Sequence, residues 1–124
     1  MTLKQLEEFL LSLPGAWLDY PFGDNIAVYK VGYKDVPGQQ EKMFALIAEG
    51  SQPLRVSLKC DPQLARTLRE RYESVQPGYH LNKKHWNTVL LEGLPPTLIK
   101  EMIQHSYDQV LAKVPKKERE MLIS

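Results

Sequence analysis

The segment from Asn82 to Asn87 holds the densest set of side chains able to bind an anion. Lys83 and Lys84 can neutralise phosphates as point charges. The amides of Asn82 and Asn87 can hydrogen-bond to phosphates or to base edges, and a protonated His85 would add another donor. These residue types in one short stretch indicate contact with a nucleic acid.

The same segment also fits a purely structural role. A tryptophan that opens an alternating strand usually packs in the core, so we favour burial of Trp86 over its use as a stacking face. Asn82 can satisfy backbone groups of a turn. Surface lysines are common, so phosphate binding and plain solvation of Lys83 and Lys84 both stay open.

Basic residues are concentrated in the middle of the chain. Residues 1–53 carry four basic and seven acidic side chains, whereas residues 54–92 carry seven basic and four acidic ones. Arg55 and Lys59 share the polar side of one predicted strand and could extend the patch begun by the two neighbouring lysines. Such a surface would bind a polyanion with strong salt dependence.

Residues suited to catalysis or metal binding form no recognisable site. Cys60 precedes a predicted helix start, where a thiolate would be stabilised, but its register with apolar neighbours favours a buried thiol. The spacing of His80, His85 and His105 is not that of a zinc site. We find no phosphate-binding glycine loop and no nucleophile elbow. The sequence therefore predicts a protein that is not an enzyme and holds no metal or cofactor.

The N-terminal half predicts one helix and three strands. Thr2 and Gln5 have the spacing of a capping box, and apolar residues then recur at helical intervals until Pro14. Turn-forming segments separate the strands that follow, which favours antiparallel hairpins. The predicted strands are Ile26–Val31, Met43–Ala48 and Leu54–Cys60.

The predicted strand Leu54–Cys60 has the clearest alternation in the chain. One side should face the core, with Leu54, Val56, Leu58 and Cys60. The other should face solvent, with Arg55, Ser57 and Lys59.

The C-terminal half predicts a helix capped by Asp61, then one or two strands, of which one spans Trp86–Leu91, and a final helix after Pro95. The apolar stripe of the first of these helices is Leu64, Ala65, Leu68 and Tyr72. Basic residues between Lys113 and Arg119 should end the final helix, where cations suit the helix dipole. This order predicts an α+β fold, a two-layer sandwich with helices on one face of an antiparallel sheet, in one domain over residues 1–124.

Composition narrows the class of protein. With 43% hydrophobic and 25% charged residues, the chain has the balance of a soluble globular protein. A net charge of +1 excludes a polycation that coats nucleic acid by bulk charge. The longest apolar run, Met43–Ala48, is too short to cross a bilayer, and a single cysteine fits a reducing compartment. We therefore expect a cytoplasmic protein without membrane contact.

The stretch PGYHLNKKHWNTV, residues 77–89, closely resembles the signature of the MmcQ/YjbR family. Further blocks similar to the family's are Pro21–Gly23, Lys59–Pro62 and His105–Asp108. The resemblance implies a fold like that of the bacterial frataxin homologues, and a DNA-binding role with hairpin loops arranged as a double wing. The chain departs from the family pattern in a longer connection over Gly32–Lys42, which could extend one wing or be tolerated surface.

Two hypotheses follow. The first is a monomeric protein that binds double-stranded DNA through phosphate contacts from Arg55, Lys59, Lys83 and Lys84, with Asn82, His85 and Asn87 orienting the surface. The second is a protein-interaction or ligand-sensing module whose recognition face includes Trp17, Tyr20 and Phe22.

Overall fold

The computed structural model describes residues 1–34 and 42–123. Most of the longer connection noted above therefore lies outside the described residues. In chain order the elements are α1 (Leu3–Ser12), β1 (Ala16–Asp19), β2 (Ile26–Val31), β3 (Met43–Ala48), β4 (Arg55–Lys59), α2 (Pro62–Arg71), β5 (Val75–Pro77), β6 (Trp86–Leu90), the 3₁₀ turn η2 (Leu91–Gly93), α3 (Pro96–Leu111) and α4 (Lys116–Ile123).

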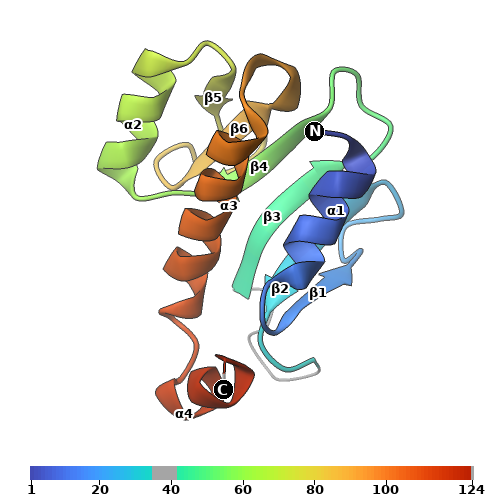
Figure 1. The fold of residues 1–124 in the computed structure, drawn as a ribbon, viewed down its shortest axis with the longest axis vertical. Helices are drawn as coiled ribbons and strands as arrows, with labels where there is room; N and C mark the ends of the chain where they lie inside the picture. Colours follow the sequence, from blue (N-terminus) through green and yellow to red (C-terminus); the bar gives the residue numbers. More distant parts are fainter. Residues whose placement is uncertain (35–41, 124) are drawn as a thin grey trace.

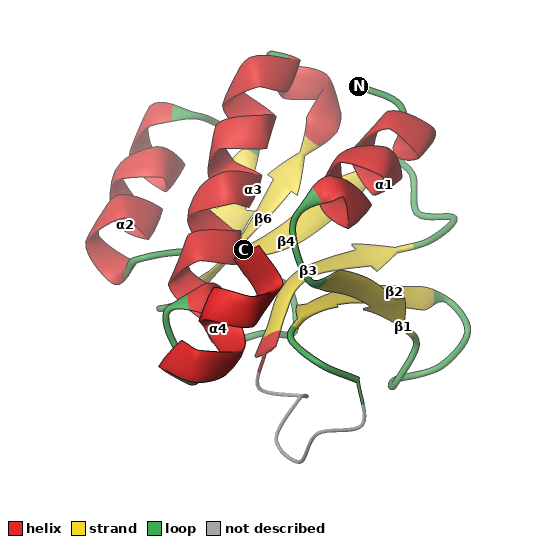
Figure 2. Ribbon diagram, turned by 60° about the horizontal axis from the view of Figure 1, so that its bottom comes forward, coloured by secondary structure: helices red, strands yellow, loops and turns green. Residues whose placement is uncertain are grey.

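The six strands form one sheet in the order β1-β2-β3-β4-β6-β5, and every neighbouring pair is antiparallel. Helices α1, α2 and α3 lie on the same face of this sheet (Figures 1 and 2). The predicted α+β architecture, with helices on one face of an antiparallel sheet, is confirmed.

The predicted helix starts are confirmed in atomic detail. The Thr2 hydroxyl accepts the Gln5 N–H at 3.1 Å, and the Gln5 side chain accepts the Thr2 N–H at 2.9 Å, which completes the capping box. The Asp61 carboxylate accepts the N–H groups of Gln63 and Leu64, both at 3.1 Å. These caps satisfy backbone donors that a helix leaves unpaired at its first turn.

The core lies between the sheet and the helices. Leu6 and Leu10 of α1 and Ile99 and Ile103 of α3 are fully buried against the sheet. The rings of Phe44 and Tyr107 meet edge to face, with centroids 5.5 Å apart. Strand residues that face this core include Ala27, Tyr29, Ala45, Ile47, Val56 and Val89.

The sequence analysis predicted no residue range for β1, β5 or α4, although it allowed a second strand before the last helix. β1 is four residues long, and β5 is three residues long and ends in Pro77 at the sheet edge, where a missing N–H is tolerated. The basic segment after Lys113 does not end α3 but begins a separate helix, α4, because Pro115 interrupts the run. Buried Val114 holds the connection between the two helices against the core.

The solvent exposure predicted for Ser57 is wrong. Ser57 is only 9% exposed, and Arg55 and Lys59 are half-buried. The sheet face opposite the helices, which we call the second face, is crossed by the segment after β5. There the Thr88 hydroxyl hydrogen-bonds with the Ser57 hydroxyl and accepts the Tyr79 N–H, each at 2.9 Å. The predicted alternation of β4 is correct, but the second face is partly covered by this segment.

The apolar stripe predicted for α2 also needs correction. Leu64 is 37% exposed, and of the four predicted residues only Ala65 is buried.

Candidate nucleic-acid interface

The turn between β5 and β6 presents two lysines on a fixed backbone. The Asn82 side chain accepts the N–H groups of Lys84 at 2.9 Å and His85 at 3.3 Å, as in an Asx turn. Trp86 is buried, 6% exposed, and anchors the turn to the sheet. Lys83 and Lys84 are exposed, so Asn82 and Trp86 shape the turn while the lysines face solvent.

Gly78 fixes how closely this turn approaches the sheet. Its N–H donates to the Trp86 carbonyl at 2.9 Å. A Cβ added at Gly78 would lie 2.7 Å from the Trp86 Cβ and 3.0 Å from the Trp86 carbonyl oxygen. Lys83 Nζ also donates to the Gly78 carbonyl at 3.3 Å, which links one lysine to the base of the turn.

Asn87 does not belong to this surface. It is 2% exposed, and its amide donates to the Ala65 carbonyl of α2 at 3.3 Å. Its side chain therefore points toward the helices and not toward the lysine turn. The sequence interpretation grouped it with its neighbours because alternation alone does not say which side of β6 the helices cover.

Lys59 lies at the same end of the sheet as the lysine turn. It pairs with Trp86 in the register of β4 and β6, and the next residue, Cys60, donates its N–H to the His85 carbonyl at 2.8 Å. Two further lysines lie near Lys59, since Lys113 and Lys42 both lower its pKa, and Lys42 Nζ donates to the Lys113 carbonyl at 3.0 Å. We call these residues the lysine end: Lys42, Lys59, Lys83, Lys84 and Lys113.

Arg55 is separated from the lysine end. It pairs with Leu90 at the opposite end of β4, roughly 13 Å along the strand from Lys59. It lines an apolar hollow on the second face of the sheet. The patch predicted from the sequence is thus divided between two places.

The sequence interpretation did not assign Lys42 or Lys113 to this surface. They lie 71 positions apart, one before β3 and one after α3. No local pattern predicts that the start of β3 and the end of α3 meet beside β4. Only the tertiary arrangement brings these two lysines to Lys59.

We expect Lys59 to titrate near pH 8. Burial lowers its pKa from 10.5 to about 8, and a hydrogen bond and charge repulsion from Lys113 add to the effect. Because folding disfavours the charged form, Lys59 lowers stability below pH 8. This penalty disappears as the pH rises from about 8 to 10.5, where the unfolded chain binds more protons than the folded one.

The Lys59 ¹³Cε resonance, followed by NMR from pH 6 to 11, measures this pKa directly. Lys113→Ala should raise it part of the way toward 10.5, because burial remains. A Lys59 pKa at its ordinary value, or one that Lys113→Ala does not change, would contradict this view of the lysine end.

The aromatic residues of the second hypothesis differ in their exposure to solvent. Trp17 is half-buried, with Lys30 Nζ and Lys34 Nζ each 5.3 Å from its ring centroid. Tyr20 and Phe22 are 39% and 57% exposed, and of the three aromatic residues only Phe22 lines the hollow that contains Arg55.

Cys60 and His105, which were considered for catalysis or metal binding, are a buried thiol and a ring that hydrogen-bonds to the backbone. Cys60 is 5% exposed, and burial raises its pKa to about 11, opposite to an activated thiolate. The His105 ring accepts the Asp61 N–H at 3.2 Å and so joins α3 to the start of α2.

Within residues 1–34 and 42–123, no group of three or more His, Cys, Asp or Glu could hold a metal ion. No helix in that part of the chain is long and apolar enough to span a membrane.

The single six-stranded antiparallel sheet with helices on one face defines a two-layer α+β protein. The chain belongs to the YjbR family, whose pattern matches residues 11–109. It is 33% identical to the uncharacterised protein YjbR of Escherichia coli K12, over 99% of this chain and 98% of that protein. It is 34% identical to the uncharacterised protein YbdF of Escherichia coli O157:H7, over 95% and 88%.

Solved structures have the same fold. The crystal structure of Deinococcus radiodurans protein DR2400 matches with a TM-score of 0.88 and 41% identity, covering 98% of this chain and 87% of that one. A crystal structure from Pseudomonas syringae matches with a TM-score of 0.71 and 28% identity, covering 89% and 99%. The family resemblance read from the sequence motifs is confirmed.

Proposed function

We propose that this protein binds double-stranded DNA without sequence preference, through phosphate contacts from the lysine end. Lys83 and Lys84 are the principal contacts, and Lys42, Lys59 and Lys113 extend the positive surface. Asn82 and His85 support the turn that presents the first two. In this proposal the chain acts by binding and catalyses no reaction.

The observation that carries the proposal is that Lys59, a half-buried lysine, lies close to other lysines. Lys113 and Lys42 lie beside it, and Lys42 Nζ donates to the Lys113 carbonyl. The ion pairs between described residues are Lys30–Asp19 and Lys116–Glu120, so no member of the lysine end is paired with a carboxylate there. Like charges held together without a counter-ion raise the free energy of the folded state, and a bound polyanion would remove that penalty.

Phosphate contacts predict a mode of binding that depends on salt and not on base sequence. Lysine neutralises phosphate as a point charge and releases condensed counterions from the duplex. The Asn82 side-chain oxygen accepts two N–H groups of its own turn, and the Asn87 amide donates to Ala65 of α2, so neither interaction involves a base edge. Affinity should therefore be similar for unrelated duplexes and should fall steeply with salt.

The double substitution Lys83→Ala and Lys84→Ala tests this proposal. Anisotropy of labelled short duplexes of two unrelated sequences should show weaker binding of the variant to both. The slope of log affinity against log salt should become shallower by about 0.9 per lost phosphate contact, so by up to about 1.8. Folding should persist, because exposed lysines contribute little to stability.

A charge-matched control removes two lysines elsewhere. Lys4 and Lys100 lie on α1 and α3, and Lys100 Nζ is 5.4 Å from the Phe9 ring centroid, away from the turn. The variant with Lys4→Ala and Lys100→Ala has the same net charge as the test variant and should keep the parental salt slope. Equal losses in both variants would mean that net charge, and not the lysine end, governs binding.

A further inference from the structure

The second face of the sheet, opposite the helices, contains an apolar hollow of about 350 Å³. Leu46 of β3 forms part of its floor, Phe22 and Leu81 contribute from loops, and Arg55 lines one side. Pockets that hold small molecules have volumes of roughly 300–1,000 Å³. A cavity of about 150 Å³ accepts a single benzene ring, so this one has room for a two-ring body.

Two aromatic side chains of this hollow are open to solvent. Phe22 is 57% exposed and Tyr79 is 64% exposed. They come from the β1–β2 connection and the β5–β6 turn, which are distant in sequence but line the same hollow. Exposed apolar side chains gathered around a concavity are typical of a ligand site, because their solvation costs free energy until a partner covers them.

Arg55 gives the hollow a positive charge without a counter-ion. Its Nε is buried and has no hydrogen-bond partner among the described residues. The ion pairs of that part of the chain involve Lys30 and Lys116, so no described carboxylate neutralises Arg55. An unpaired buried donor on a permanently charged side chain is costly. The guanidinium matches the geometry of a carboxylate, which would accept two parallel hydrogen bonds from it.

Backbone strain lies at the same place. His80 lines the hollow and has a φ of 58°, an uncommon conformation for a residue with a side chain. Its ring contacts the Tyr79 ring at an interplanar angle of 54°, with centroids 4.0 Å apart. The Tyr79 N–H donates to the Thr88 hydroxyl. Strained residues fixed by their surroundings cluster at ligand clamps.

We propose that this hollow binds a small organic anion, a carboxylate attached to an aromatic body of one or two rings. The carboxylate pairs with Arg55, and the ring system lies on Leu46 and Leu81 beside the Phe22 and Tyr79 side chains.

The site adjoins the lysine end, because residues 79–81 belong to the turn that also carries Lys83 and Lys84. Its anion-pairing residue, Arg55, lies at the opposite end of β4 from Lys59, and the proposal does not depend on the proposed DNA binding.

2-Naphthoate is a suitable probe, and uncharged 2-naphthylmethanol is its matched control. The Arg55 Nε–H resonance in ¹H–¹⁵N spectra should shift on addition of naphthoate and should not shift with the alcohol. Arg55→Met should weaken naphthoate binding by about tenfold or more, since it removes a charge-assisted pair. Arg66→Met, which changes an exposed arginine of α2, should have no effect.

Phe22→Ala provides a second test that does not depend on how Arg55→Met folds, because Phe22 is largely exposed. It should weaken binding of naphthoate and leave the specificity for the anion unchanged. Lys84→Ala changes an exposed lysine of the lysine end and keeps the hydrogen bond from Lys83 to the Gly78 carbonyl, so it should leave naphthoate affinity unaltered. Equal binding of the acid and the alcohol would overturn the proposal. So would no binding of naphthoate at millimolar concentration, or loss of binding in the Lys84→Ala variant.

Discussion

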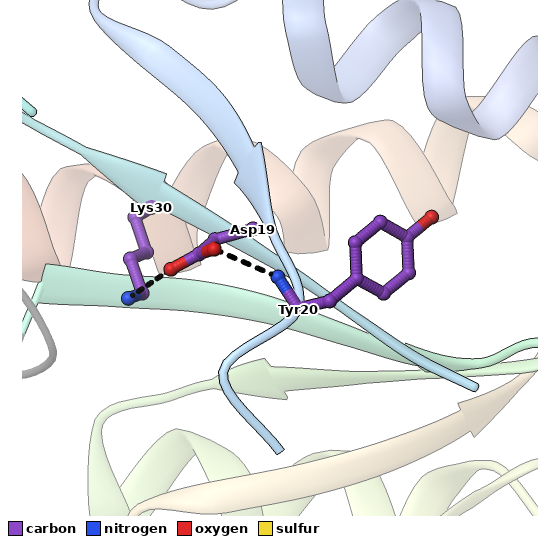
Figure 3. Close-up of polar contacts among 3 residues, drawn as sticks. All are labelled: Asp19, Tyr20 and Lys30. Atoms are coloured by element: carbon purple, nitrogen blue, oxygen red, sulfur yellow. Dashed lines mark hydrogen bonds and ion pairs between the residues drawn. The ribbon is translucent and has the colours of Figure 1, made fainter. Parts of the chain in front are cut away.

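Asp19→Asn is expected to destabilise the protein by about 2–3 kcal/mol, because it leaves a buried ammonium group without its counter-ion. The side chain of Lys30 is 3% exposed, and its Nζ lies 2.9 Å from Asp19 Oδ2 (Figure 3). The other carboxylate oxygen accepts the Tyr20 N–H at 2.9 Å. The expected loss is below that of a fully buried pair because the Asp19 side chain is 40% exposed. Urea unfolding at pH 7 measures it.

The double variant separates the ion pair from other effects of the substitution. Lys30→Met fills the buried position without a charge, so Asp19→Asn in that background should cost much less than in the parent. If Asp19→Asn costs the same in both backgrounds, the buried charge of Lys30 is not the reason for the loss.

The Asp19–Lys30 pair also makes the free energy of unfolding depend on pH in the acid range. The hydrogen bond from Lys30, followed by that from Tyr20, lowers the pKa of Asp19 below 3.8. A carboxylate whose folded pKa is depressed stabilises the protein above its unfolded pKa, and this stabilisation is lost as the pH falls through the folded value. The contribution of Asp19 is therefore complete above about pH 5 and declines below pH 3.8.

Ser106→Ala is expected to cost about 2–4 kcal/mol, because it leaves two backbone groups without a partner. Ser106 is fully buried on α3. Its hydroxyl donates to the Phe44 carbonyl at 2.6 Å and accepts the Lys59 N–H at 2.9 Å. One small side chain thereby connects α3 to both β3 and β4 at the lysine end.

Ser12→Ala is the matched control. The Ser12 hydroxyl also donates to a backbone carbonyl, that of Phe9 at 2.6 Å, but it is exposed at the end of α1. Its removal should change the free energy of unfolding by less than about 0.5 kcal/mol. Similar small losses for Ser12→Ala and Ser106→Ala would show that the buried bridge contributes little.

The segment His105–Asp108 supported the family resemblance, and the structure gives three of its residues structural contacts. His105 binds the Asp61 N–H, Ser106 bridges two strands, and the Tyr107 hydroxyl donates to the Pro14 carbonyl. These contacts join α3 to α2, to the sheet and to the end of α1. A motif that identifies the family therefore describes how the fold is held together, and it does not by itself locate a binding surface.

The elements with strong local signals were predictable from the sequence. The capping box at Thr2, the Asp61 cap and the period of two over β4 each rest on neighbouring residues. A second strand after α2 was allowed, but β5 could not be located in this way, because three residues ending in a proline carry no periodic signal. α4 was missed because the helical pattern before Val114 hid the interruption at Pro115.

The binding surface was only partly predictable, since it depends on which segments meet at one end of the sheet. Lys83 and Lys84 could be selected because they share one turn. Lys59 lies near them because β4 pairs with β6, whereas Arg55 on the same strand lines the apolar hollow. Lys59 and Arg55 are four residues apart on β4, yet one belongs to the lysine end and the other to the hollow. Their spacing in the sequence does not predict this difference.

Chemical-shift mapping with a short duplex of mixed sequence tests the proposed DNA binding most directly. In low salt, titration of the ¹⁵N-labelled protein should shift amide signals of residues 82–85 and those near Lys42, Lys59 and Lys113. Added salt should reverse these shifts, because the contacts are to phosphate. The absence of shifts in low salt, or shifts confined to the hollow around Arg55, would contradict the assignment of the lysine end as the DNA-binding surface.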